Sequence, residues 1–249
     1  MFFFSRNKPV LKDLIPEGHI DIHAHLLPGI DDGAATFADS LQLIQAMQGF
    51  GITQFIATPH IIQGIWDNTH EQIISKKEET LQLLANSKAS VPLHAAAEYL
   101  MDDQFARLFQ KKELLTLKGK HVLVEMSYIN APIQLYNILY DLQLAGYVPV
   151  LAHPERYLFY HNDFNEYAKL VKAGCLLQLN LLSVVGYYGG EIAKIAEKLL
   201  SKGMYSYVGS DVHHLRHIAA FDQKVLLKDL QPLHEIIVNN QFFKRDTIE

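Results

Sequence analysis

Short runs of β-branched and apolar residues alternate along this chain with longer segments in which apolar residues recur at helical spacing. The strand-like runs cover residues 19–26, 53–58, 93–98, 121–126, 148–152, 176–180 and 205–209. Helical spacing is found at 37–49, 68–84, 132–145, 164–173 and 191–201. Such alternation builds parallel sheets with right-handed crossovers, so the pattern predicts one α/β domain, and a barrel fits its length.

Glycines end several of the helical segments, as at Gly146, Gly174 and Gly203. Glycine is favoured just past the last helical residue, so these positions lie at the N-terminal side of the next strand. Whatever follows each strand therefore lies at the opposite edge of the sheet. Binding sites in barrels and open α/β sheets form at that C-terminal edge.

Metal-binding residue types follow six of the seven predicted strands. His23 and His25 are two residues apart on the first strand, so both imidazoles point to one face. The later strand ends carry further candidates: His60, Glu98, Glu125, His153, Asp211 and His213. Burying these groups together without cations would oppose folding, because desolvation and charge repulsion both act against it. The sequence predicts a site for two or more divalent ions.

The loop after the first strand leaves two interpretations open. Asp31 and Asp32 lie in a turn-forming segment, residues 27–33, where aspartate serves equally as a turn or helix-cap residue. Their position beside His23 and His25 favours a ligand role for one of them.

The remaining histidines divide into three groups by position. His19, His94 and His121 open strands, and we expect them to be hydrogen-bonded or exposed. His214 and His217 follow His213, either as support for the site or as part of a surface loop. Solvated positions are expected for three others: His70, His161 and His234.

Composition narrows the class of protein. The chain has 249 residues, of which 49% are hydrophobic, enough for one substantial core. Its net charge of -5 gives no basic face for nucleic acid. No segment approaches the length of a transmembrane helix. The start of the chain, with Phe2, Phe3 and Phe4, is too short for a signal peptide, and a docked arm is the simplest interpretation.

The single cysteine, Cys175, lies in an apolar run and can form no intramolecular disulfide. This indicates a buried thiol in a reducing compartment, which the cytoplasm fits best. No Cys-x5-Arg phosphate loop surrounds it, which argues against a cysteine-dependent phosphatase.

These motifs resemble those of the polymerase-and-histidinol-phosphatase (PHP) family. Within it, the chain resembles the bacterial PHP-type protein-tyrosine phosphatases of capsule and exopolysaccharide biosynthesis. The segments that carry the resemblance are residues 21–25, 28–34, 57–60, 152–156 and 209–213, together with Glu98 and Glu125. The Asp-Asp-Gly loop and the His-Pro-Glu-Arg segment are the most discriminating of them.

The resemblance implies a distorted seven-stranded (β/α)7 TIM-like barrel over residues 19–249, behind an N-terminal arm of residues 1–18. It also implies three metal ions. The first would be held by His23, His25, Glu98 and Asp211, the second by Glu98, Glu125 and His153, and the third by Asp32, His60 and His213. Arg156 would bind phosphate. Arg216 lies slightly early for the family's second arginine, and its role stays open.

The predicted activity is hydrolysis of phosphotyrosine on the tail of a partner kinase, by attack of a metal-held hydroxide on phosphorus. Mixed imidazole and carboxylate ligands suit Mn, Fe or Zn, with Mn as the first choice. Tyr128 and Tyr157 could grip the substrate ring, although loop or core packing explains them equally well. Two rivals remain: a small-molecule phosphatase such as histidinol phosphatase or a phosphodiesterase of the same superfamily, and a non-catalytic metal-stabilised module that docks on a kinase.

Overall fold

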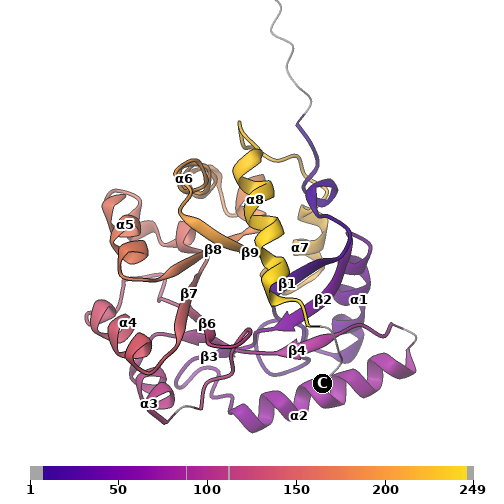
Figure 1. The fold of residues 1–249 in the computed structure, drawn as a ribbon. Helices are drawn as coiled ribbons and strands as arrows, with labels where there is room; N and C mark the ends of the chain where they lie inside the picture. The colour runs from indigo at the N-terminus through magenta and orange to yellow at the C-terminus, as the bar shows by residue number, and fades with distance from the viewer. Residues whose placement is uncertain (1–7, 88, 112, 246–249) are drawn as a thin grey trace, which may run out of the picture.

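The computed structural model describes residues 8–87, 89–111 and 113–245, and it contains two sheets with helices packed around them (Figure 1). The smaller sheet has the order β1 (His19–Ala24), β2 (Ile52–Ala57), β4 (Leu93–Ala95). The larger has the order β3 (His60–Ile61), β5 (Glu98–Leu100), β6 (His121–Glu125), β7 (Val148–Ala152), β8 (Leu176–Asn180), β9 (Tyr205–Gly209). Each pairing between neighbouring strands is parallel, which confirms the predicted α/β architecture.

The third predicted strand, residues 93–98, is not continuous. Ala96 and Ala97 separate β4 from β5, and Thr58 with Pro59 separates β2 from β3. Proline cannot donate to a strand ladder, which explains the second interruption. The two interrupted strands stay paired across the breaks, because the amide of Ala96 donates to the carbonyl of Ala57 at 2.8 Å and that of Glu98 to the carbonyl of Pro59 at 3.1 Å.

The opposite edges of the two sheets meet beyond β1 and β9. Ala24 and Val212 form a parallel bridge, and the amide of Asp211 donates to the carbonyl of His23 at 2.8 Å. The loop after the last strand is thereby fixed against the end of the first. Segments nearly two hundred residues apart in sequence share one edge of the strands.

Five helices match the predicted ones to within a few residues. They are α1 (Phe37–Gln48), α2 (His70–Asn86), α4 (Leu135–Leu144), α5 (Asn165–Lys172) and α6 (Gly190–Ser201). Thr36 begins α1 and Thr69 begins α2 with capping boxes, in which the threonine and the residue three positions later satisfy each other's backbone amides.

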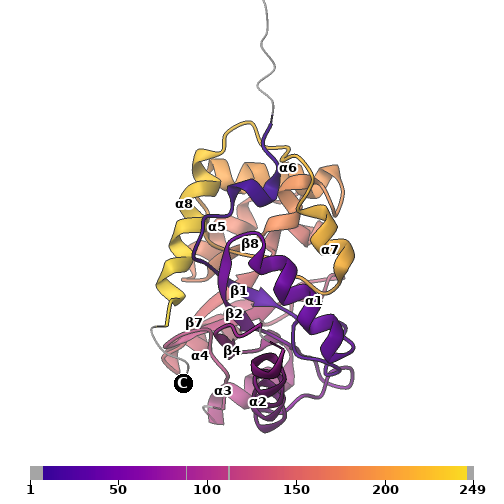
Figure 2. The same cartoon turned by 90° about the vertical axis from the view of Figure 1, so that its right-hand side faces the viewer.

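Three further helices were not predicted: α3 (Asp103–Lys111), α7 (Leu215–Ala220) and α8 (Gln231–Asn239). At six residues, α7 is too short for a helical period to emerge. In Figure 2, α8 lies along one side of the strands, with α1 and α7 along the other.

A compact apolar cluster fills the space between the strands. It contains Ile20, Ile22, Ile56, Ala96, Leu117, Leu123, Val150, Ala152 and Phe243. Phe243 comes from a 3-10 turn after α8 (Asn240–Phe243), and the side-chain amide of Asn240 donates to the carbonyls of Ile20 and Val208 at 2.9 Å. The C-terminal segment therefore closes the N-terminal end of the strands, and polar groups gather at the other end.

The described part of the N-terminal arm docks on the segment between α7 and α8. Val10 pairs antiparallel with Lys224, and Leu11, in a 3-10 turn (Leu11–Leu14), is buried. Phe2 to Phe4 lie outside the described residues. Among the described helices, none combines the length and apolar character needed to cross a membrane.

The histidines at the strand starts differ in part from expectation. His121 donates a hydrogen bond from Nδ1 to the carbonyl of Lys118 at 3.2 Å, as predicted. His19 is buried, and neither of its ring nitrogens has a hydrogen-bond partner among the described residues, so the prediction for it was wrong. Burial lowers the pKa of His19 to about 4, which keeps the ring neutral. His70 and His234 are exposed, as predicted.

Candidate metal centre

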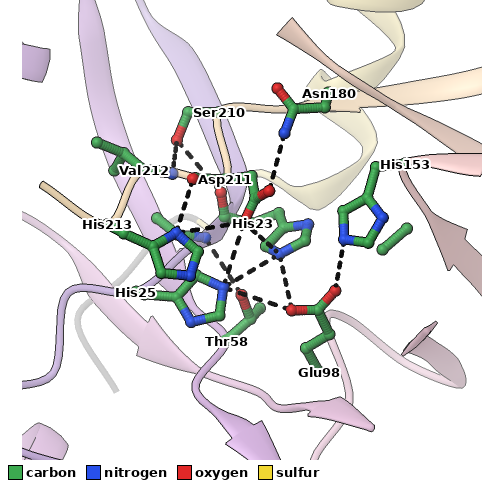
Figure 3. Close-up of polar contacts among 12 residues, drawn as sticks. His23, His25, Thr58, Glu98, His153, Asn180, Ser210, Asp211, Val212 and His213 are labelled. Atoms are coloured by element: carbon green, nitrogen blue, oxygen red, sulfur yellow. Dashed lines mark hydrogen bonds and ion pairs between the residues drawn. The ribbon is translucent and has the colours of Figure 1, made fainter. Parts of the chain in front are cut away.

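Four buried side chains converge at the C-terminal edge of the strands: His23, His25, Glu98 and Asp211 (Figure 3). The Nε2 atom of His23 lies 3.1 Å from Glu98 Oε2 and 3.3 Å from Asp211 Oδ1. The Nε2 atom of His25 lies 3.4 Å from each of the same two oxygens. Four ligands about 2.1 Å from a central ion would lie about 3.4 Å apart in a tetrahedron. The spacing of this group thus fits a divalent ion.

The outer nitrogens of the two histidines fix which atoms face the centre. His23 Nδ1 lies 2.9 Å from Gln178 Oε1, and His25 Nδ1 lies 2.8 Å from Asp31 Oδ2. Both partners are acceptors, so in the neutral ring each Nδ1 carries the proton and each Nε2 presents a lone pair. These two lone pairs face each other at 3.3 Å, beside two carboxylates. Such an arrangement repels itself unless a cation lies between the groups.

The loop after β1 assigns different roles to its two aspartates. Asp31 is buried, where it orients His25 and accepts from the amide of Gly33 at 2.9 Å. Asp32 is exposed, and its Oδ1 lies 3.5 Å from His60 Nε2 and 3.4 Å from His213 Nε2. Asp32 is the one within reach of a shared ion. A Cβ atom at Gly33 would lie 2.3 Å from the carbonyl oxygen of His25, which explains the glycine.

Two further groups adjoin the first. His25, Asp32, His60 and His213 form one, and His60, Glu98 and Glu125 form the other. His60 belongs to both, because its Nδ1 lies 2.9 Å from Glu125 Oε1 while its Nε2 faces Asp32. His153 Nε2 lies 3.0 Å from the outer oxygen of Glu98, Oε1. The structure therefore brings the nine predicted ligand side chains together. It also places His60 beside Glu125, although the family resemblance assigns these two residues to different ions.

The carboxylates and histidines of the centre shift one another's pKa values. Burial alone would lower the pKa of His23, but the charges of Glu98 and Asp211 raise it to about 9. Burial opposes ionisation of Asp211, yet His23 and His213 hold its pKa well below the usual range. His23 and Asp211 are thus stabilised in their charged forms by their neighbours, and a divalent ion would take the place of the proton on His23.

Two of these side chains come from strained backbone. His153 has a φ of 37° and Asp211 a φ of 52°, in the left-handed region that non-glycine residues rarely occupy. Glu155, fully buried, holds the turn after His153 by accepting from the amide of Asn180 at 3.0 Å and from the hydroxyl of Tyr205 at 2.8 Å. Strain maintained in this way is typical of functional sites.

Comparison with known proteins agrees with this geometry. A family model described as capsular polysaccharide synthesis, CpsB/CapC, matches residues 19–220. The chain belongs to the CpsB/CapC family. The tyrosine-protein phosphatase YwqE of Bacillus subtilis is 32% identical to it over 200 residues, 79% of this chain and 78% of that protein. The resemblance drawn from the motifs is confirmed.

Solved structures extend the comparison to the fold. A chain from the crystal structures of YwqE from Bacillus subtilis and CpsB from Streptococcus pneumoniae, described as unique metal-dependent tyrosine phosphatases, superposes with a TM-score of 0.76 at 27% identity, over 91% of this chain and 88% of that one. An amidohydrolase from Mycoplasma synoviae shares the fold, with a TM-score of 0.55 at 13% identity over 93% and 88% of the two chains.

Arg156 lies at the edge of the centre in this CpsB/CapC-family chain. Its Nη1 donates to Asp211 Oδ2 at 2.8 Å, and its side chain is 20% exposed. Arg216 is exposed and, with His213, lines a separate cavity of about 410 Å³. The structure thus places Arg156 beside the metal groups, and Arg216 on the flank of His213.

The two tyrosines predicted to grip a substrate ring differ. Tyr128 is 46% exposed, and its ring stacks on His153 with centroids 5.8 Å apart. Tyr157 is fully buried, where its hydroxyl accepts from the amide of Met126 and donates to the carbonyl of Ala152. A substrate cannot reach its ring, so the prediction that Tyr157 grips the substrate ring was wrong.

Supporting residues surround the centre, and several of them were missed from the sequence. His217 is buried and accepts from the amide of His213 at 3.1 Å, so the supporting interpretation holds for it. Gln178 and Asn180 on β8 orient His23 and Asp211, and were not predicted. The sequence feature that could have revealed them is the pair of polar residues at alternate positions of a buried strand. Burial raises the pKa of Cys175 to about 12, which excludes it as a nucleophile.

Proposed function

We propose that this chain is a metal-dependent protein-tyrosine phosphatase that acts in capsular or exopolysaccharide synthesis. The observation that carries the proposal is the buried group of His23, His25, Glu98 and Asp211, whose lone pairs and charges face one point. YwqE and CpsB, named as tyrosine phosphatases, support the activity.

The nine side chains would hold two or three divalent ions. His23, His25, Glu98 and Asp211 take the first, Glu98, Glu125 and His153 the second, and Asp32, His60 and His213 the third. Glu98 would contribute to both of the first two, since Oε2 faces the histidines at the end of β1 and Oε1 faces His153. Mn, Fe and Zn all suit this donor set, and Mn is our first choice. The two parallel sheets that carry these groups are one distorted seven-stranded barrel, in which β2 with β3 and β4 with β5 each count as one strand.

Bound ions would lower the pKa of water toward neutrality and offset the charge of a phosphoryl group. Arg156 binds phosphoryl oxygens with the donors that Asp211 leaves free. The exposed part of the Tyr128 ring contacts the phenyl group of the substrate. A phenolate has a parent pKa of about 10 and leaves readily, so these residues need not supply a strong general acid.

The substrate we favour is the phosphotyrosine-bearing tail of a partner kinase, in the cytoplasm. A single, buried cysteine, Cys175, is consistent with a reducing compartment. A histidinol-phosphate phosphatase, a phosphodiesterase and a non-catalytic docking module remain the alternatives that an assay must separate.

The test is a phosphoester panel on purified protein loaded in turn with Mn²⁺, Fe²⁺ and Zn²⁺. We expect kcat/KM on a phosphotyrosine peptide to exceed that on histidinol phosphate and on bis-p-nitrophenyl phosphate by at least about a hundredfold, a difference of roughly 3 kcal/mol. A preference for either small substrate would overturn the protein-phosphatase assignment. Lack of turnover on every phosphoester with metals bound would favour the docking module.

A further inference from the structure

The guanidinium group of Arg156 is held by more than its ion pair. Its Cζ lies 4.8 Å from the ring centroid of Tyr128 and 4.2 Å from that of Tyr188. Tyr128 follows β6, Arg156 follows β7 and Tyr188 follows β8, and β7 is the middle strand of the three. The two rings therefore reach Arg156 from the neighbouring strands on either side.

Tyr188 is fixed at its hydroxyl as well as at its ring. The buried side-chain amide of Asn180 donates to the hydroxyl of Tyr188 at 3.1 Å and to Asp211 Oδ2 at 2.8 Å. The same oxygen of Asp211 accepts from Arg156. Arg156, Asp211, Asn180 and Tyr188 thus form a closed circuit of contacts, and Tyr128 packs on the arginine from outside it.

Simple core packing does not explain this arrangement. Tyr128 is 46% exposed and Tyr188 is half-buried, so both rings lie at the surface of the centre. Arginine has a long side chain with many rotamers, and ordering it at the moment of binding weakens affinity for an anion. Aromatic rings that hold the cation beforehand remove that loss, and they leave its charge intact.

We propose that Tyr188 and Tyr128 are positioning residues that hold Arg156 ready for the phosphoryl group. The inference rests on the proposed function, because it takes Arg156 as the phosphate-binding side chain. Tyr188 is the stronger of the two, since its ring lies closer and its hydroxyl is anchored. Loss of either ring leaves Arg156 attached to Asp211 but free to take other orientations.

Calorimetric titration of the manganese-loaded protein with inorganic phosphate tests this without requiring turnover. Tyr188→Leu should weaken phosphate binding by about three- to tenfold, and Tyr128→Leu by a smaller factor. Tyr188→Phe and Tyr128→Phe keep the rings and should bind within about twofold of the unmodified protein. Tyr140→Leu, an exposed tyrosine on α4, is the matched control. Equal phosphate affinity for Tyr188→Leu and the unmodified protein would overturn the proposal.

A double-mutant cycle separates positioning from general damage to the site. If Tyr188 acts through Arg156, Tyr188→Leu should have no further effect on phosphate affinity in the Arg156→Ala background. An equal loss in both backgrounds would contradict the proposal, and manganese content measured on each variant identifies damage to the metal groups. Phosphate binding that depends on the rings, without turnover of any phosphoester, would refute the proposed function and leave this inference standing. Turnover of a phosphoester, together with a phosphate affinity that does not change when the rings are removed, would support the proposed function and refute this inference.

Discussion

Asp31 Oδ2 lies 2.8 Å from His25 Nδ1, and both side chains are buried. The carboxylate fixes the imidazole with Nε2 toward Glu98 and Asp211, and it raises the basicity of that nitrogen. Asp31 therefore acts on a metal ion without touching it, whereas its neighbour Asp32 faces His60 and His213.

Asp31→Asn keeps the shape of the side chain and removes its charge. We expect the dissociation constant of the tightest Mn²⁺ ion to rise by about ten- to hundredfold, as is usual when the partner of a ligating histidine is altered. Asp163→Asn, at an exposed loop position, is the control. The measurement is competition for Mn²⁺ against a chelator, and an unchanged constant would rule out the orienting role of Asp31.

Among the predicted ligands, Glu98 is the one whose loss should lower the metal content most. Its two oxygens contact histidines that lie on or directly after three different strands, His23, His60 and His153. Glu98→Ala should remove at least one ion per chain and reduce kcat on a phosphotyrosine peptide by at least about a thousandfold. Elemental analysis and steady-state kinetics check this, with Glu78→Ala on the exposed face of α2 as control. Activity near that of the unmodified protein would overturn the ligand assignment.

Glu155 should matter for stability more than for metal affinity. Its carboxylate accepts from the Asn180 amide and from the hydroxyls of Ser183 and Tyr205. Glu155→Gln replaces one accepting oxygen by an NH2 group, which leaves one of these three donors without an acceptor. We therefore expect a loss of about 1 to 3 kcal/mol in the free energy of unfolding. Urea denaturation of the metal-free protein measures it, with Glu78→Gln on the exposed face of α2 as a surface control. A loss no larger than that of the control would show that the turn is held by other contacts.

His19 predicts a specific acid sensitivity. Its folded pKa of about 4 lies below the unfolded value of about 6.5, so between these values the unfolded chain binds more protons and stability falls as pH falls. The loss should reach about 3 kcal/mol near pH 4. In metal-free protein, His19→Leu should lose less unfolding free energy between pH 7 and pH 4.5 than the unmodified chain. His234→Leu, at an exposed position, should match the unmodified chain, and equal slopes for all three would contradict the argument.

The fold was predictable from sequence as far as periodicity extends. Strand runs and five helices follow from apolar spacing, and the glycines that end helices separate the two edges of the sheet. Ala96 and Ala97 continue the apolar run of their strand, so composition gives no sign of the break between β4 and β5. The six residues of α7 are too few for a period.

The site could be predicted from the sequence where ligand-type residues recur at the ends of strands. The sequence predicts a metal centre because His23, His25 and the ligand-type residues at most other strand ends would oppose folding if their charges were unpaired. The supporting layer was harder to predict. Asp31 and Asp32 are adjacent and identical, and burial alone distinguishes them. Tyr157 has the residue type of a substrate contact, but its position below the surface can be learned only from packing.

The most direct test of the account is a crystal of the protein grown with Mn²⁺, with anomalous scattering recorded on both sides of the manganese absorption edge. The account predicts a strong anomalous peak bonded to His23, His25, Glu98 and Asp211, and at least one more peak that shares Glu98. Absence of anomalous density from these side chains, at a Mn²⁺ concentration that supports full phosphatase activity, would contradict it.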